Sequence, residues 1–277
     1  MASPQPVDEP AGDTGSAPVL SLRGITKSFG AVQALTDIDL DVGAGEVVAL
    51  LGDNGAGKST LAKILSGVHP PDGGTILFQG REVAIANPTE SRALGIATVY
   101  QDLALCDNLD VVANLFLGRE EKNFTLREEV MERRAWELLR QLSAKLPSVR
   151  VPVVSLSGGQ RQTVAIARSL VGRPSVVILD EPTAALGVAQ TAEVLNLIER
   201  LRETNHGVLL ITHNMADVQE VADRAVVLRL GRNNGDFDVR TTPYQDIVAA
   251  ITGATDSAVT RRAAAVASKR EAERTTP

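Results

Sequence analysis

One stretch constrains the fold of this chain more than any other: a glycine-rich loop at residues 52–60, placed after the apolar run Val47–Leu51. Glycine lets the backbone turn so that its N–H groups face inward, where they can surround a phosphate group. The apolar run Leu61, Ala62, Ile64 and Leu65 continues as a helix, whose positive end faces the same place. The pattern predicts a strand, a phosphate-binding loop and a helix.

Two side chains at the end of the loop indicate which phosphates it binds. Lys58 would reach the terminal phosphates as a point charge, and the Ser59 hydroxyl is placed to bind a magnesium ion that bridges them. A glycine-rich turn without a ligand is the alternative, but it leaves the lysine and the hydroxyl at this spacing unexplained. Kinases, GTPases, motors and transporters share such a loop, so it predicts a ligand and no particular function. The predicted nucleotide contacts are Gly52, Asp53, Asn54, Gly55, Ala56, Gly57, Lys58, Ser59 and Thr60.

Composition narrows the class of protein. With 277 residues, 44% of them hydrophobic, the chain can form one large globular domain or a domain with a subdomain. A net charge of -6 and the lack of a long basic run argue against a nucleic-acid partner. The single cysteine, Cys106, suits a reducing compartment. No apolar stretch approaches the roughly 20 residues that span a bilayer, so any membrane span must come from another chain.

The order of predicted elements divides the chain into parts. Residues 1–18 are expected to form a disordered leader, and residues 254–277 a C-terminal tail. Residues 19–101 and 155–253 alternate strands with helices, whereas residues 102–154 are nearly all helical and are expected to form a subdomain. Within that subdomain, residues 125–128 read as a capping box that opens a charged helix. Residues 231–236 are expected to form a loop.

Four predicted strands end at residues that could contact a phosphate: Gly52 in the loop, Gln101, Asp180 with Glu181, and His213. Ligands of an open parallel sheet bind outside the carboxyl ends of its strands, so these residues are expected to surround one phosphate group. Asp180 is placed to hold the magnesium ion, and Glu181 to accept a proton from the water that attacks the γ-phosphate.

Each of these residues also has an ordinary structural interpretation. The Asp180–Glu181 pair taken alone is a charged turn after a strand, and a lone glutamine such as Gln101 is commonly a solvated loop residue. Gln101 is otherwise expected to bind the metal and orient water. His213 is either a structural histidine or the group that holds the attacking water and the γ-phosphate by hydrogen bonds.

A second anion-binding helix start occurs at Ser157, Gly158, Gly159 and Gln160. One nucleotide does not need two such helix starts from one chain. We therefore expect a head-to-tail dimer, in which this helix closes over the nucleotide held by the partner's Lys58 loop.

Together these motifs resemble the ATP-binding subunit of an ABC transporter, over roughly residues 20–230. Residues 52–59 match the Walker A motif, Val176–Asp180 the Walker B motif and residues 156–160 the family signature. Gln101 matches the Q-loop, His213 the switch histidine and Phe29 the aromatic residue that stacks on adenine, although a phenylalanine at a strand end is commonly a core residue. The resemblance implies an α/β P-loop NTPase of the ABC type, with a mixed-sheet core, an N-terminal antiparallel β subdomain and a helical subdomain.

The same resemblance implies transport work with ATP and Mg²⁺. ATP binding would close two copies, hydrolysis would reopen them, and the motion would pass to membrane permease subunits. Their short helices would dock in a groove that includes residues 101–109, which places the protein on the cytoplasmic face of the membrane as a peripheral subunit.

The segments at residues 111–119, 184–188 and 247–253 resemble ATPases of monosaccharide importers, such as those for ribose, xylose, galactose or fructose. The sugar is expected to bind other subunits, among them a sugar-binding protein that this chain meets only indirectly. One position departs from the family pattern: Gly187 stands where an aspartate is usual, which leaves the coupling between the two ATP sites open.

Two other functions fit the phosphate loop. A soluble ABC ATPase of DNA repair or translation would generally carry a long coiled-coil insertion or paired ATPase domains, and the sequence has neither. A small-molecule kinase would leave the helix start at Ser157 without a role.

Overall fold

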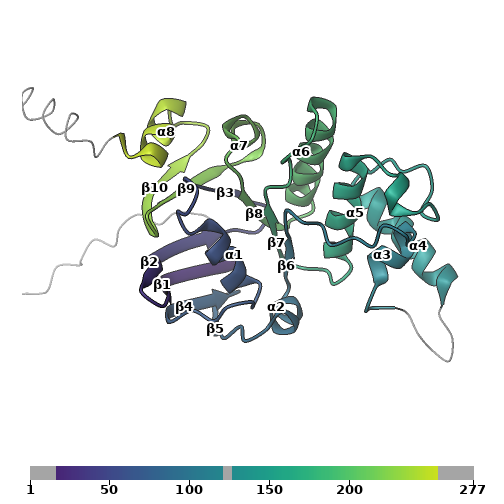
Figure 1. Ribbon diagram of the computed structural model, residues 1–277, viewed down its shortest axis with the longest axis horizontal. Helices are drawn as coiled ribbons and strands as arrows, with labels where there is room; N and C mark the ends of the chain where they lie inside the picture. Colours follow the sequence, from purple (N-terminus) through teal and green to yellow (C-terminus); the bar gives the residue numbers. More distant parts are fainter. Residues whose placement is uncertain (1–16, 121–126, 255–277) are drawn as a thin grey trace, which may run out of the picture.

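The computed structural model describes residues 17–120 and 127–254. Two β-sheets lie side by side, and a group of helices extends from one end of the larger sheet (Figure 1). The fold class predicted from the sequence, α/β with an antiparallel and a mixed sheet, is confirmed.

The smaller sheet is antiparallel, with strand order β2-β1-β4-β5. Leu22 of β1 pairs with Leu40 of β2 on one side and with Ile76 of β4 on the other, and all three side chains are buried. One face of this sheet is therefore apolar and packs on the core, and its other face is free to contact water. Its strands are β1 (Leu20–Phe29), β2 (Val32–Val42), β4 (Gly73–Phe78) and β5 (Arg81–Val83).

The larger sheet has strand order β10-β9-β3-β8-β7-β6, and all its pairings are parallel except β10 with β9. Its inner strands are continuous apolar runs because helices and the other sheet cover both faces. The parallel strands are β3 (Val47–Leu51), β6 (Ile96–Val99), β7 (Val176–Asp180), β8 (Gly207–Ile211) and β9 (Arg224–Arg229).

The prediction of a loop at residues 231–236 is wrong. Residues 232–236 belong to strand β10 (Arg232–Asp238), which pairs antiparallel with β9 at the edge of the sheet, and Gly231 lies in the turn before it. The strand has no apolar alternation in its first half, because an edge strand exposes most of its side chains. The overlooked signal is the tight turn at Leu230 and Gly231, whose φ angles are 49° and 74°. Two successive left-handed residues are typical of a two-residue β-hairpin.

Helix α1 (Lys58–Leu65) lies between the two sheets and joins them in one hydrophobic cluster. Leu61 and Ile64 are fully buried there, together with Leu22 of the smaller sheet and Leu50 of the larger one. The helix start is thereby fixed at the carboxyl end of β3. The predicted short helix after Asn87 is confirmed as α2 (Pro88–Leu94), and the Asn87 side chain accepts hydrogen bonds from the next backbone N–H groups.

The helices at the right of Figure 1 share a hydrophobic cluster with the other face of the larger sheet and extend beyond its β6 edge. Buried Asn114 fixes the loop that leads to them, because its side chain bonds N–H and C=O of Cys106 and the carbonyl of Leu109. The helices are α3 (Val111–Phe116), α4 (Glu128–Gln141), α5 (Gly158–Leu170) and α6 (Val188–Glu203), with a short 3₁₀ turn at Val153–Ser155.

The predicted capping box at residues 125–128 is partly outside the described residues, since the structure describes neither Thr125 nor Leu126. Helix α4 begins at Glu128, after Arg127, whose side chain makes no capping hydrogen bond. The helix start therefore differs from the predicted one, and acidic residues in the first turn interact with the helix dipole instead.

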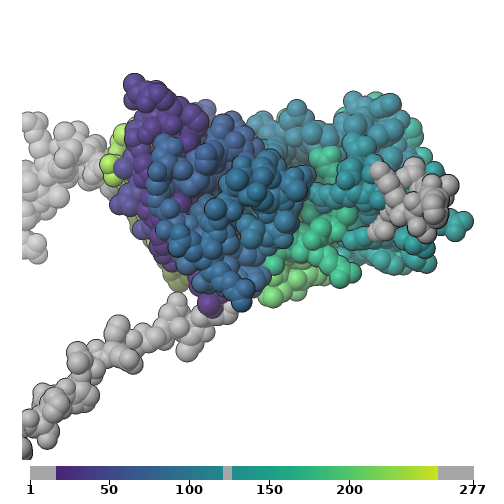
Figure 2. Space-filling view, turned by 90° about the horizontal axis from the view of Figure 1, so that it is seen from below, coloured from purple at the N-terminus to yellow at the C-terminus, as the bar shows by residue number. Residues whose placement is uncertain are grey.

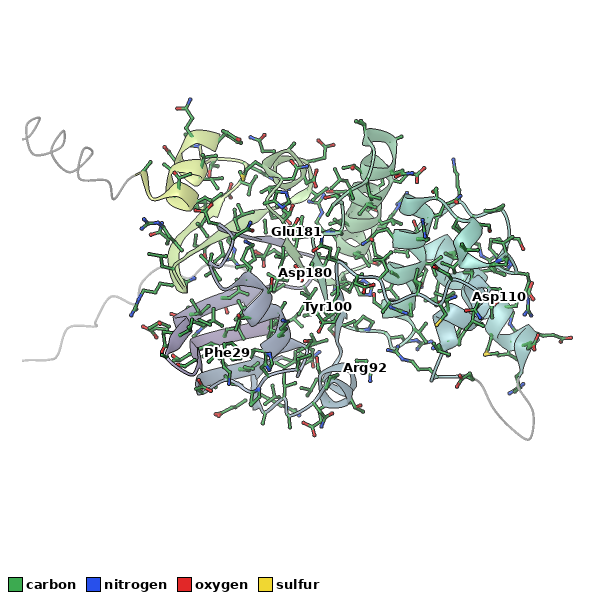
Figure 3. The ribbon with its side chains drawn as sticks, in the orientation of Figure 1. Phe29, Arg92, Tyr100, Asp110, Asp180 and Glu181 are labelled. Carbon is green, nitrogen blue, oxygen red and sulfur yellow. The ribbon has the colours of Figure 1, made fainter. Side chains whose placement is uncertain are left out.

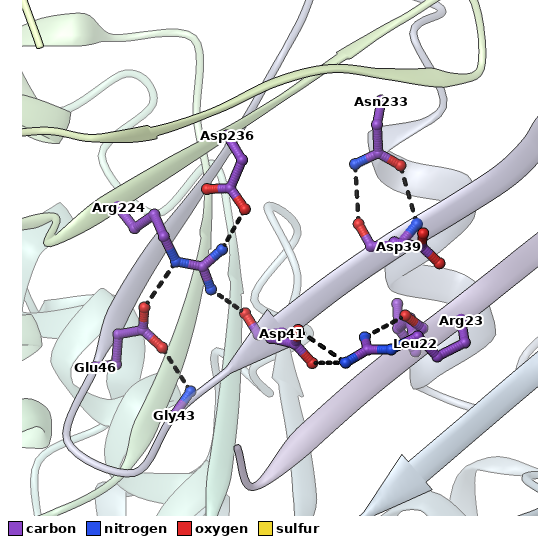
Figure 4. Close-up of polar contacts among 9 residues, drawn as sticks. All are labelled: Leu22, Arg23, Asp39, Asp41, Gly43, Glu46, Arg224, Asn233 and Asp236. Atoms are coloured by element: carbon purple, nitrogen blue, oxygen red, sulfur yellow. Dashed lines mark hydrogen bonds and ion pairs between the residues drawn. The ribbon is translucent and has the colours of Figure 1, made fainter. Parts of the chain in front are cut away.

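Polar contacts link the edges of the two sheets (Figure 4). The Arg224 guanidinium on β9 donates to Glu46 at 3.0 Å, to Asp236 at 2.6 Å and to the carbonyl of Asp41 on β2 at 2.6 Å. The side-chain amide of Asn233 bonds both backbone groups of Asp39, each at 2.9 Å. The smaller sheet is thus held against the β9–β10 hairpin as well as against α1.

Two further helices, α7 (Met215–Val221) and α8 (Tyr244–Thr252), follow β8 and β10. Within residues 17–120 and 127–254, no helix has the length and apolarity needed to cross a membrane.

Candidate nucleotide site

The phosphate loop joins β3 to α1, and its backbone requires glycine at two positions. Gly52 has φ 146°, and a Cβ there would lie 2.2 Å from the carbonyl oxygen of Leu228. Gly57, the N-cap of α1, has φ 108°, and a Cβ there would lie 2.5 Å from Cδ2 of Leu35. The loop is therefore packed against β9 and β2 at its two ends, and its backbone shape is fixed.

Lys58 lies inside this loop. Its side chain is almost completely buried, and Nζ donates to the carbonyls of Gly52 at 2.6 Å and Asp53 at 3.0 Å. Burial lowers the pKa of Lys58, and the negative charges of Glu181, Asp53 and Asp180 oppose that shift. The lysine charge is thus concentrated in the loop and faces the carboxylates at the end of β7.

The strand register brings the predicted carboxylates to the loop. Leu50 of β3 pairs with Ile211 of β8, and Ile211 pairs with Asp180 of β7, so the three strands end at the same level. Asp180 and Glu181 lie together near the centre of the molecule (Figure 3). Burial, followed by the negative charge of Glu181, raises the pKa of Asp180, while Lys58 acts in the opposite direction. A cation beside these carboxylates would relieve both effects.

Glu181 has an unusual backbone conformation. Its φ is 51°, in the left-handed region that side chains other than glycine rarely adopt. Its N–H donates to the carbonyl of Ile211 at 2.8 Å, which fixes the turn at the end of β7. The turn directs the Glu181 side chain to His213, whose Nδ1 lies 2.9 Å from Oε1 and 2.8 Å from Oε2 of the carboxylate. The two predicted residues are therefore in contact.

Gln101 lies at the same edge of the sheet. It follows β6, whose Val99 pairs with Leu179 next to Asp180, and its side chain is exposed. Ser59, Gln101 and Asp180 together offer oxygen donors, which suit a hard cation such as Mg²⁺ that keeps several waters. Among the described residues, no group of three or more His, Cys, Asp or Glu is arranged to hold a different metal.

Phe29 at the end of β1 is 43% exposed and is not a core residue. Its ring meets the edge of the His69 ring, with centroids 5.2 Å apart and an interplanar angle of 71°. Lys27 Nζ lies 5.6 Å from the same ring and is held by Asp72 at 2.6 Å. Sequence reasoning did not predict that His69, Lys27 and Asp72 gather at Phe29, because His69 and Asp72 come from the turn after α1.

The second predicted helix start is at α5. The Ser157 hydroxyl accepts from the Gln160 N–H at 3.2 Å, and the Gln160 side chain accepts from the Ser157 N–H at 3.0 Å. This reciprocal capping box was not predicted, although Ser-x-x-Gln is its sequence signature. Within the described residues, no hydrogen bond joins Ser157 or Gln160 to the phosphate loop, and Figure 1 shows α5 among the helices on the other side of β6 and β7 from α1.

Comparison with known proteins decides the family. Residues 35–184 match the ABC transporter family. The chain belongs to this family. The xylose/arabinose import ATP-binding protein of Sulfolobus acidocaldarius is 48% identical to this ABC ATPase over 216 residues, which are 77% of this chain and 86% of the relative. The fructose import ATP-binding protein of Rhizobium meliloti is 43% identical over 246 residues, which are 86% of this chain and 95% of the relative.

Other relatives are longer than this ABC ATPase. A ribose import ATP-binding protein of Rubrobacter xylanophilus is 46% identical, and the match spans 78% of this chain but only 43% of the relative. Solved structures show the same fold: a nucleotide-free ATP-binding cassette from an ABC transporter has a TM-score of 0.75 at 25% identity, covering 84% of this chain and 98% of its own. A dimeric bacterial ABC transporter cassette has a TM-score of 0.68 at 25% identity, covering 80% and 100%.

These findings confirm three predictions for this ABC ATPase: the family, the fold class and ATP hydrolysis as the activity class.

The structure also describes the backbone at Gly187, the position where the predicted family pattern has an aspartate. Gly187 is the N-cap of α6, and a Cβ there would meet no atom within 4 Å, so the backbone leaves room for a side chain that this chain lacks.

Proposed function

We propose that this chain is the ATP-hydrolysing subunit of an importer for a monosaccharide. The observation that carries the proposal is the Glu181 carboxylate, which is held by His213 at the end of β7 and faces the Lys58 loop. A carboxylate in that position can accept the proton of a water that attacks the terminal phosphate.

The other residues of the site have complementary roles in the proposal. Lys58 balances the charge of the terminal phosphates, and the loop N–H groups bind their oxygens. Ser59, Gln101 and Asp180 would hold Mg²⁺, whose positive charge neutralises the phosphate oxygens when it is bound. His213 keeps the Glu181 carboxylate in place and can donate a hydrogen bond toward the γ-phosphate. The exposed ring face of Phe29 would stack on adenine.

Half of this site would come from a second copy of the chain. Ser157, Gly158, Gly159 and Gln160 form the positive end of α5, which Figure 1 shows apart from α1 of the same chain. In a head-to-tail dimer, these residues would close over the nucleotide of the partner. The dimeric cassette among the structural relatives supports such an assembly.

Sugar import is supported by the relatives, which are named as import ATP-binding proteins for xylose or arabinose, ribose and fructose. In the proposal, the chain is a peripheral subunit on the cytoplasmic face of the membrane. It passes the closing and opening of the dimer to permease subunits, and a sugar-binding protein delivers the substrate to them. Residues 19–101 and 155–253 would act as the ATPase core and residues 102–154 as the helical subdomain.

Glu181→Gln tests the role of the carboxylate. We expect this variant to bind ATP as tightly as the unchanged protein, to lose hydrolysis and to accumulate as an ATP-bound dimer on size-exclusion chromatography. Glu220→Gln on the exposed side of α7 is the matched control, and we expect it to hydrolyse ATP normally. Unchanged hydrolysis by Glu181→Gln would exclude Glu181 as the base.

The substrate is tested with the membrane partner. The tagged chain is purified with its permease, and ATP hydrolysis is measured in proteoliposomes with the binding protein and candidate sugars. Stimulation by one monosaccharide would identify the substrate. Transfer of phosphate to a small molecule, instead of release as free phosphate, would support the kinase alternative.

A further inference from the structure

Glu181 and His213 are carried by two loops, one after β7 and one after β8. Both loops belong to the second half of the chain, whose green segments lie between the blue α2 region and the teal helices on the face shown in Figure 2. The His213 side chain is 74% exposed, and among the described residues its only hydrogen-bond partner is Glu181. The contact between the two side chains therefore depends on how firmly the two loops are held together.

A buried carboxylate, that of Asp217, binds both loops. Asp217 lies on α7, which follows the second loop, and is 3% exposed. Its Oδ2 accepts a hydrogen bond at 2.5 Å from the hydroxyl of Thr183, two residues after Glu181. Its Oδ1 accepts one at 2.8 Å from the side-chain amide of Asn214, the residue after His213. Each bond is thus made within two residues of the Glu181–His213 pair.

The loop after Glu181 has few other polar contacts with the rest of the fold. Residues 182–186 belong to no strand or helix, and the backbone bonds of Ala184 and Leu186 stay inside the loop. Within the described part of the chain, the Thr183 hydroxyl makes the only side-chain hydrogen bond from residues 182–186 to another element. This hydroxyl therefore sets the position of the loop relative to α7.

Capping of α7 does not account for Asp217. An acidic residue at the third position of a helix ordinarily accepts a hydrogen bond from the backbone N–H of the N-cap residue. Here the N-cap is Asn214, and its N–H donates to the Thr212 hydroxyl at 3.0 Å. The Asn214 side chain caps the helix itself, since its oxygen accepts from the Ala216 N–H at 3.1 Å. The two oxygens of Asp217 are thus left for the two loops.

The burial of this carboxylate is unfavourable unless its bonds compensate for the lost water. Within residues 17–120 and 127–254, no cationic side chain forms an ion pair with Asp217. Its two hydrogen bonds are charge-assisted, and such bonds are shorter and stronger than those between neutral groups. The negative charge of Asp217 therefore strengthens the two bonds that join the loops.

We propose that Asp217 is a positioning residue for ATP hydrolysis. Through Thr183 and Asn214, it holds the two loops at the separation at which the Glu181 carboxylate meets the His213 ring. The inference rests on the proposed function, in which Glu181 accepts the proton of the attacking water. A displacement of about 1 Å at a reacting group can lower a rate by about a hundredfold, so loosening either loop should slow the reaction.

NMR spectroscopy of the ligand-free protein tests the contact directly. The chain has three histidines, so a histidine-labelled sample gives three sets of ring resonances, and those of His213 are identified by their loss in His213→Gln. Glu181→Ala defines the resonance position of a His213 ring without its partner. We expect Thr183→Val, which replaces the hydroxyl with a methyl group of similar size, to shift the His213 resonance toward that position. The resonances of His69 and His206 should not move.

Hydrolysis gives the second measurement. We expect Thr183→Val to lower kcat about tenfold or more and to leave KM for ATP within about twofold, because the Lys58 loop is unchanged. Thr183→Ser keeps the hydroxyl and should restore both the rate and the His213 resonance. Thr252→Val is the matched control: it removes a hydroxyl that bonds the carbonyl of Val248 in α8, and it should change neither quantity.

The other arm supplies an independent variant. Asn214→Ser keeps a residue that can cap α7 but lacks the amide that donates to Asp217. It should lower kcat and shift the His213 resonance in the same direction as Thr183→Val. Circular dichroism and a cooperative thermal transition above the assay temperature show which variants are folded.

The outcomes separate this inference from the proposed function. The inference is overturned if both arm variants keep the unchanged kcat, or if kcat falls without a shift of the His213 resonance, which would show a general structural effect. Failure of Thr183→Ser to restore the rate would overturn it as well. If the resonance shifts as expected while Glu181→Gln hydrolyses ATP normally, the link between the loops is confirmed and the proposed role of Glu181 fails.

Discussion

The left-handed backbone of Glu181 leads to a prediction about the sign of a stability difference. With φ at 51°, the residue at this position carries conformational strain unless it is glycine. The hydrogen bond from the Glu181 N–H to the carbonyl of Ile211, together with the preceding strand β7, keeps the residue in this conformation. Comparing Glu181→Gly with Glu181→Ala isolates the strain, because both variants remove the same carboxylate and its contact with His213.

The magnitude can be worked from two opposing terms. The left-handed conformation costs alanine about 1–2 kcal/mol, and glycine avoids this cost. Glycine loses about 0.5–1 kcal/mol more backbone entropy than alanine on folding. The difference favours Glu181→Gly over Glu181→Ala by about 1 kcal/mol, which corresponds to about 2–4 °C in melting temperature for a chain of this size.

Equilibrium unfolding in urea of the ligand-free variants measures this difference. The matched control is the pair Glu193→Gly and Glu193→Ala in the interior of α6. Because glycine disfavours a helix, the alanine variant should here be the more stable of the two by about 1 kcal/mol. Neither Glu181 variant should hydrolyse ATP. The reasoning is refuted if Glu181→Ala proves as stable as Glu181→Gly while the α6 pair behaves as expected.

Three further predictions concern the site and the fold. Asp180→Asn should raise the melting temperature of the ligand-free protein at neutral pH. Burial and the charge of Glu181 raise the pKa of Asp180 above its ordinary 3.8, so ionisation of Asp180 destabilises the fold as the pH rises through that range. When melting is measured against pH, the higher melting temperature of Asp180→Asn should therefore disappear in acid. Arg224→Met should cost about 2–3 kcal/mol in urea unfolding, because it leaves carboxylates at the sheet junction unpaired, whereas exposed Arg232→Met should cost little. Ser157→Ala should cost about 1 kcal/mol of stability through the lost helix cap but reduce ATP hydrolysis more than tenfold, and Ser157→Thr should keep the cap.

Much of the fold was predictable because its inner elements have unambiguous local patterns. Strands β3, β7 and β8 are short, continuous apolar runs, and a polar or glycine residue ends each of them. Helix α6 has the predicted bounds, Val188–Glu203. The same strand ends carry the candidate site, so a sheet with parallel β3, β8, β7 and β6 brings Lys58, Asp180, Glu181 and His213 together without further information.

The features that sequence reasoning missed depend on contacts between distant segments or on polar positions. Strand β10 is defined by pairing with β9, and its side chains carry little of the apolar signal. The ring of His69 meets Phe29 only because the turn after α1 lies beside the end of β1. Arg92, Arg119 and Arg168 line one pocket although the first and the last are 76 residues apart, and only the fold shows that they share this space.

Strand β6 and helix α5 connect the candidate nucleotide site with the helical part of the molecule. Strand β6 ends beside β7, which carries Asp180 at its end and Glu181 just after it. Gln101 follows β6, and the loop after it is held by Arg168 on α5. Since α5 begins at Gly158, with Ser157 as its N-cap, one helix has the predicted partner-nucleotide contact at its start and Arg168 near its end. Under the proposed function, a displacement of this 13-residue helix would move its Ser157 end and the loop after Gln101 together.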